Sequence, residues 1–106
     1  NPSSVESTLR AFSAADHTAP LAILGDMMEL GDHAAEGHQL ARDVARECGI
    51  ECWVVGGQFA THAPGDRTFQ DLAALLAALE EDSLSGRTVL LKGSRSMQLE
   101  SLVPHL

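Results

Sequence analysis

Apolar residues recur along the chain at two different spacings, which predict alternating helices and strands. Helical spacing covers residues 3–15, with Ser3 or Ser4 as the expected N-terminal cap, and residues 33–48. The second of these helices is expected to bury one face and to turn the other toward solvent; the buried set is Leu40, Ala41, Val44, Ala45 and Cys48, and the solvent set is Arg42, Asp43, Arg46 and Glu47. Further helices are expected at 58–62, 71–81 and 97–102.

Short apolar runs without polar alternation predict buried strands at 21–24, 52–55 and 87–91. The pattern leaves open whether the sequence RTF, residues 67–69, adds a brief edge strand. Helices and strands alternate along the chain, which is typical of a parallel sheet covered by helices. We therefore expect a three-layer α/β fold with a mostly parallel sheet and helices on both faces, formed as a single domain over residues 1–106.

The composition narrows the classes of partner. Seven Lys and Arg stand against 15 Asp and Glu, which gives a formal net charge of −8. Because nucleic acid and anionic lipid attract basic surfaces, neither is an expected partner. No apolar run approaches the roughly 20 residues that span a bilayer, and no secretory signal pattern opens the chain. Cys48 and Cys52 have no further cysteine beside them, which favours two buried, reduced thiols over a zinc site.

Two of the seven basic residues, Lys92 and Arg95, follow an expected strand in the sequence VLLKGSRSM. Ligands of open parallel sheets bind beyond the carboxyl ends of the strands. The loops that leave those ends all contain glycine and should share one edge of the sheet (residues 25–33, 56–58 and 92–97). Two cations and the amides at the start of an expected helix predict an anion-binding site there. The alternative is internal pairing of Lys92 and Arg95 with Asp26 or Glu29.

The segment DMMELGDHAAEGH holds many potential metal ligands, but its spacing fits no calcium loop. His33 and His38 are five residues apart and would not share one helix face, so no metal site is expected. Asp32 is expected to cap the following helix, with Glu36 in its first turn. Most of the five histidines are expected to be exposed, and Trp53 is expected in the core. The chain carries neither a Walker-type phosphate loop nor a G-x-G-x-x-G, and it has no Ser-His-Asp or Cys-His motif.

Three stretches, taken together and in order, resemble one family. They are NPSS at 1–4, LAILGDMMELGDHAAEGH at 21–38 and VLLKGSRSMQLESLV at 89–103. They resemble the C-terminal domain of the Mur ligases, and in particular of the MurF type. The resemblance implies a Rossmann-like domain, the last of three in a cytoplasmic enzyme of peptidoglycan synthesis. Such an enzyme joins D-Ala-D-Ala to UDP-MurNAc-tripeptide through an acyl phosphate, with ATP and Mg²⁺ bound mainly by the central domain.

The resemblance also implies roles for particular residues. The loop with Lys92, Ser94 and Arg95 is expected to hold the dipeptide carboxylate or a nearby phosphate. Asp26 is expected to orient the dipeptide amine or a basic neighbour. The hinge and the adenosine side of ATP are expected near two residues of the NPSS stretch, Asn1 and Ser3. No catalytic group is expected within this chain.

Two departures from the family pattern matter. The nucleotide cradle is missing, so the chain alone is expected to be inactive. The family also has a strand just before the NPSS stretch, and without it an open sheet edge would favour self-association. Two alternatives stay open: the same domain from another Mur-superfamily ligase, such as a folylpolyglutamate synthase, or a stand-alone α/β module that binds a small anion without catalysis.

Overall fold

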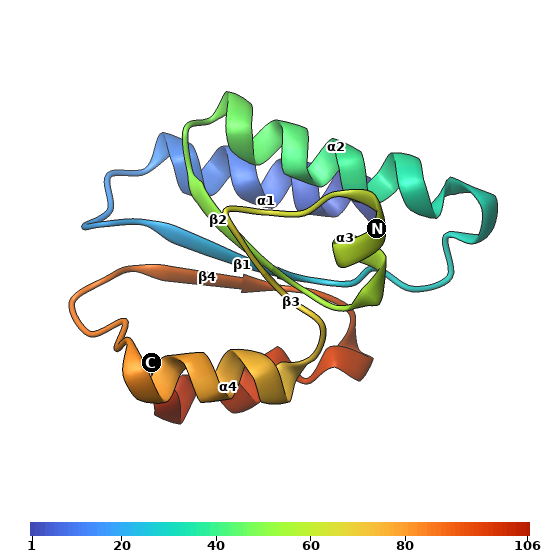
Figure 1. Ribbon diagram of the computed structural model, residues 1–106. Coiled ribbons are helices and arrows are strands. Elements are labelled where there is room, and N and C mark those ends of the chain that lie inside the picture. Colours follow the sequence, from blue (N-terminus) through green and yellow to red (C-terminus); the bar gives the residue numbers. More distant parts are fainter.

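The computed structural model describes residues 1–106, in which helices and strands alternate (Figure 1). The strands are β1 (Leu21–Gly25), β2 (Glu51–Val55), β3 (Arg67–Phe69) and β4 (Val89–Lys92). The α-helices are α1 (Pro2–Ala14), α2 (Ala34–Glu47), α3 (Gly57–His62) and α4 (Leu72–Glu81), and the 3-10 helices are η1 (Gly31–His33), η2 (Arg95–Met97) and η3 (Leu99–His105). None of the helices combines the length and the apolar character needed to cross a bilayer.

The four strands form one parallel sheet in the order β3-β2-β1-β4. Leu21 at the start of β1 is in register with Glu51 of β2 on one side and with Val89 of β4 on the other. The RTF segment joins the sheet as β3, an edge strand that pairs with the end of β2. The expected α/β fold with a parallel sheet is therefore confirmed, and every strand ends at the same edge.

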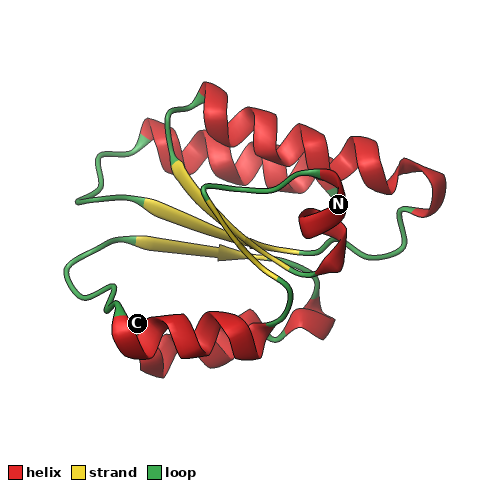
Figure 2. Cartoon of the chain, viewed as in Figure 1, coloured by secondary structure: helices red, strands yellow, loops and turns green.

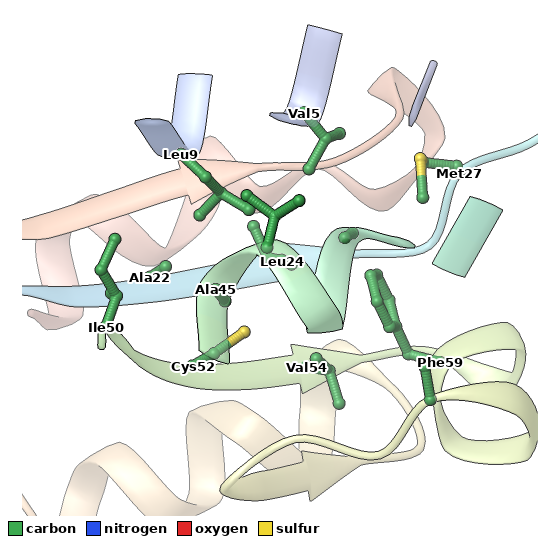
Figure 3. Packing of buried hydrophobic residues seen from close by; sticks show 13 residues of the cluster. Val5, Leu9, Ala22, Leu24, Met27, Ala45, Ile50, Cys52, Val54 and Phe59 are labelled. Carbon is green, nitrogen blue, oxygen red and sulfur yellow. The ribbon is translucent and has the colours of Figure 1, made fainter. Parts of the chain in front are cut away.

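Helices cover both faces of the sheet (Figures 1 and 2). The helices α1 and α2 lie on one face, and α4 and η3 lie on the other. Successive strand residues point alternately into the two cores, since the side-chain period of a strand is two. The first core takes Ala22, Leu24, Cys52 and Val54 (Figure 3), and the second takes Leu21, Ile23, Trp53 and Val55. Both faces are buried, which explains the continuous apolar runs of β1 and β2.

The expected helix caps differ from the observed ones. Asn1, and neither serine, caps α1: its side chain accepts a hydrogen bond from the amide of Ser4 at 2.8 Å. Pro2 then occupies the first helical position, where its fixed φ suits the helix start. The expected cap of α2 by Asp32 is wrong, because η1 leads directly into α2 and no side chain caps that helix.

The expected faces of α2 also need correction. Arg42, expected in solvent, is only 8% exposed, and Leu40, expected in the core, is 39% exposed. The expectation that most of the histidines are exposed is wrong: only His33 and His105 are exposed, and His38 is completely buried. The reason is that α3 packs beside α2, and that the chain after α3 reaches Arg42 through the carbonyl of Pro64. A third neighbour therefore covers part of the face that periodicity alone assigns to solvent.

The expected α-helix at 97–102 is replaced by the 3-10 helices η2 and η3. Gln98, with φ 52°, adopts the left-handed conformation and separates the two. This break turns Leu99 and Leu102 into the second core, where both are buried. The loop after β4 consequently has no α-helix N-terminus to offer an anion.

Candidate functional site

The loops that leave β1, β2 and β4 meet around Asp26. The amide of Asp26 donates to the carbonyl of Val55 at 3.1 Å, and its carbonyl accepts from the amide of Ser94 at 3.2 Å. These two bonds tie the end of β1 to the ends of both neighbouring strands. The turns that hold Asp26 and Arg95 therefore lie side by side at one edge of the sheet.

The carboxylate of Asp26 is used within the protein. It is 5% exposed, and its two oxygens accept from the amides of Gln58 at 3.0 Å and Phe59 at 2.9 Å. These amides belong to the first turn of α3, whose unpaired donors need such a partner. Gly56 makes the approach possible: its φ is +121°, and a Cβ there would overlap the Asp26 carboxylate.

A pocket of about 410 Å³ opens beside these loops. The start of α1, the residues after β1 and the residues after β4 line it: Asn1, Val5, Met27, Met28, Glu29, Lys92, Gly93, Ser94, Arg95 and Ser96. The pocket thus brings together Lys92, Ser94, Arg95 and Asn1. It does not include Ser3, which is exposed on α1, or the buried carboxylate of Asp26.

The pocket contains the two basic side chains that have no acidic partner. The other five form ion pairs within the protein: Arg10 with Glu6 and Glu47, Arg42 with Asp66, Arg46 with Asp43, Arg67 with Asp82, and Arg87 with Glu51. Lys92 and Arg95 form none, so the alternative of internal pairing with Asp26 or Glu29 is not observed. The charges of Lys92 and Arg95 are therefore free to bind an anionic group, and a guanidinium can bind a carboxylate or phosphate through two parallel hydrogen bonds.

The loop after β4 lies tightly against β1. A Cβ on Gly93 would come within 2.9 Å of the Cα of Gly25, so this approach depends on glycine. The hydroxyl groups of Ser94 and Ser96 are hydrogen-bonded to each other at 2.9 Å, and the amide of Met97 donates to the Ser94 carbonyl. These contacts fix the backbone that carries Arg95.

The part of the pocket wall formed by Met27 is held by His38, a residue whose structural role the sequence analysis missed. Its Nε2 accepts a hydrogen bond from the amide of Met27 at 3.0 Å. The proton must therefore reside on Nδ1, which lies 2.6 Å from the carbonyl of Ala34. The ring also contacts Phe59 edge-on. A signal existed in the sequence, because position 38 lies three residues before Ala41 and seven before Ala45, both of which are buried.

The donor set suits an anion and not a metal ion. No group of three or more His, Cys, Asp or Glu side chains is close enough together to hold a metal. Lys92, Arg95 and the serine hydroxyls offer hydrogen-bond donors, which match the oxygens of a carboxylate or phosphate. Lys92, Arg95 and the serine hydroxyls of the pocket can therefore bind the anionic part of a ligand.

Comparisons of the sequence and of the fold with known proteins find ligases of the same type. The chain is 32% identical, over its whole length, to the UDP-N-acetylmuramoyl-tripeptide–D-alanyl-D-alanine ligase of Treponema pallidum (strain Nichols), and it spans 25% of that protein. Its fold matches the crystal structure of a MurF ligase from Thermotoga maritima in complex with ADP, with a TM-score of 0.75 and 19% identity over 99% of this chain. It also matches MurF from Acinetobacter baumannii, with a TM-score of 0.71 and 25% identity over 98% of this chain. In each structure it corresponds to 25% of the chain. No family model matches.

Proposed function

We propose that this chain, a MurF-type Mur ligase C-terminal domain by sequence and by fold, presents D-Ala-D-Ala within an ATP-dependent ligase that extends UDP-MurNAc-tripeptide. Residues 1–106 would be one domain of a longer protein, since they span about a quarter of each relative. The other domains of that protein would bind ATP, Mg²⁺ and the UDP-sugar. The chain by itself would be inactive, because the sequence has no Walker-type phosphate loop.

The observation that carries the proposal is the pair of unpartnered cations in one pocket. The guanidinium of Arg95 and the ammonium of Lys92 would bind the carboxylate of the dipeptide. Ser94 would add a hydroxyl to the same side of the pocket. Asp26 would act indirectly, because its carbonyl fixes Ser94 while its carboxylate holds α3.

The structure supports a role near the nucleotide and the hinge better for Asn1 than for Ser3. Asn1 lines the pocket, although its side-chain oxygen also caps α1. Ser3 lies on the exposed side of α1 and outside the pocket. Of the two, Asn1 is better placed to contact a ligand that extends from the pocket toward a neighbouring domain.

The chemical contribution of this chain would be positioning. ATP, when bound by the complete protein, supplies the phosphoryl group that activates the substrate carboxylate. The residues of this pocket would hold the dipeptide so that its amine faces that activated carbon. Fixing two reactants in this way contributes on the order of 7–11 kcal/mol to a reaction at best, because it removes most of the translational and rotational entropy cost.

Steady-state kinetics of the full-length protein test the proposal. Arg95→Ala should raise the KM for D-Ala-D-Ala by about tenfold or more, since a charge-assisted pair contributes roughly 1.5–3 kcal/mol. The KM for ATP should stay unchanged. Arg46→Ala is the matched control, because that arginine forms an exposed pair with Asp43 and does not line the pocket. An unchanged KM for the dipeptide in Arg95→Ala would show that this pocket does not bind the dipeptide carboxylate. A change in the KM for ATP alone would show that Arg95 binds a phosphate group instead.

A further inference from the structure

The loop after β1 is fixed at two residues, Met27 and Leu30, on either side of its exposed part. Met27 is 5% exposed, and its amide is bonded to His38. Leu30 packs against Gly37, where a Cβ would overlap both the Leu30 and the Pro2 side chains. Between these anchors only Met28 and Glu29 are exposed, and both line the pocket. The backbone at Glu29 is consequently held on both sides.

Glu29 has two unusual properties for a residue in this position. Its φ is +62°, a left-handed conformation that side chains other than glycine, asparagine and aspartate seldom adopt. Its carboxylate forms no ion pair, although Lys92 and Arg95 line the same pocket. Left-handed residues of this kind persist where the surrounding structure holds them, often at ligand sites. The pocket therefore contains separated charges of both signs.

We propose that Glu29 binds the ammonium group of the ligand whose carboxylate lies at Lys92 and Arg95, so that the pocket selects a zwitterion. This inference rests on the proposed function and adds the contact to the amine. Glu29 replaces Asp26 as the proposed partner of the amine, because both carboxylate oxygens of Asp26 already accept hydrogen bonds from the amides of Gln58 and Phe59. Glu29 is the exposed carboxylate of the pocket that remains for the amine.

The same charge also explains selectivity against other anions. A dianion such as phosphate would be attracted by Lys92 and Arg95 but repelled by Glu29 in the same pocket. A ligand with one carboxylate and one ammonium has a partner for each of its charges. Binding of the correct ligand and rejection of a simple anion therefore come from the same side chain.

Two ligands that differ only in the amine separate this inference from the proposed function. D-Ala-D-Ala is the substrate, and N-propionyl-D-alanine has hydrogen in place of the ammonium and can act only as an inhibitor. Glu29→Gln keeps the shape and removes the charge. In the full-length protein we expect the KM for D-Ala-D-Ala to rise by about tenfold, while the inhibition constant of N-propionyl-D-alanine stays the same or falls, because Glu29 no longer repels its carboxylate. Asp32→Asn is the control, because Asp32 is exposed nearby but outside the pocket.

The possible outcomes each decide one question. Equal changes for both ligands, or no change for either, would overturn the role of Glu29. If Arg95→Ala weakens both ligands, the proposed function stands whatever Glu29→Gln does. If Arg95→Ala affects neither, the proposed function fails and this inference fails with it. Circular dichroism spectra of the variants confirm that the fold is kept.

Discussion

Single residues at the sheet edge act mainly through the backbone. Asp26 joins the ends of β1, β2 and β4 with its amide and carbonyl, its carboxylate holds the start of α3, and the residue does not line the pocket. Gly56 and Gly93 are needed because neighbouring atoms occupy the space of a Cβ. A pocket built in this way keeps its shape only while these close approaches are preserved.

Gly56→Ala tests that dependence. Alanine at φ +121° is strained, and its Cβ would displace the Asp26 carboxylate from the start of α3. We expect the free energy of unfolding to fall by about 2 kcal/mol or more. Gly57→Ala is the matched control, since nothing lies within 4 Å of its Cβ position and its φ is not positive. Urea denaturation measures both, and equal stability of the two variants would contradict the account.

The thiol of Cys52 is expected to make the free energy of unfolding depend on pH. Burial raises the pKa of its thiol to about 12, from an ordinary value of 9.0. The folded state therefore keeps this proton where the unfolded state releases it. The stability that results is complete below pH 9 and is lost as the pH rises toward 12.

Urea titrations at pH 8 and pH 10.5 test this expectation. The chain has no tyrosine and its single lysine is Lys92, so few other groups titrate in this range. We expect the free energy of unfolding to be lower at pH 10.5, and Cys52→Ala to show a smaller loss than the parent protein. The half-buried Cys48 provides the control variant Cys48→Ala. An identical loss in Cys52→Ala would show that another group is responsible.

At the scale of elements, α2 is held by polar contacts that lie on its buried side. Arg42 donates to the carbonyl of Pro64 and to the carboxylate of Asp66, both at 3.1 Å. Asp66 in turn accepts from the amide of Cys52 at 2.8 Å, so one carboxylate connects α2, β2 and the turn before β3. This network fixes the helix that carries His38.

Asp66→Ala should destabilise the fold, because it leaves the buried Arg42 guanidinium without its acidic partner. We expect a loss of about 1–3 kcal/mol, kept modest because the Asp66 side chain is 47% exposed. Asp43→Ala removes an exposed partner of Arg46 and should change stability by less than about 0.5 kcal/mol. Thermal unfolding of both variants provides the comparison, and similar melting temperatures would argue against a structural role for the network.

Periodicity predicts the elements well and their polar contacts poorly. The strands β1, β2 and β4 and the helices α1, α2 and α4 follow from spacing, because burial on one face or two leaves a local pattern, whereas the pattern left β3 open. The burial of Arg42 and His38 depends on α3 and on residues 63–66, which lie more than twenty positions further along the chain. No local pattern contains that information. The break at Gln98 is missed for the same reason, since the burial of Leu99 and Leu102 decides it.

The site shows the same division. The sequence predicted that Lys92 and Arg95 would lie together at the carboxyl edge of the sheet, and both line the pocket; their binding of an anion stays a prediction. The burial of the Asp26 carboxylate could not be predicted, since Asp26 and Glu29 both follow β1 and only the packing shows which carboxylate is buried.

At the scale of the whole molecule, the unpaired cations lie at the carboxyl ends of the strands, and β4 forms a lateral edge of the sheet. β4 is an edge strand with half-buried side chains, so its outer edge is free to pair. Self-association of the isolated chain therefore stays a prediction. Sedimentation equilibrium should show a mass that increases with concentration above 11.2 kDa, and a constant monomer mass would contradict it.

The pocket beside Lys92 and Arg95 is proposed to hold the carboxylate of an incoming dipeptide. The most direct test is a crystal structure of the full-length protein with D-Ala-D-Ala bound. We predict the dipeptide carboxylate at about 2.7–2.9 Å from the nitrogens of Arg95 or Lys92. A dipeptide bound elsewhere, with the side chains of Lys92 and Arg95 facing solvent, would contradict this prediction.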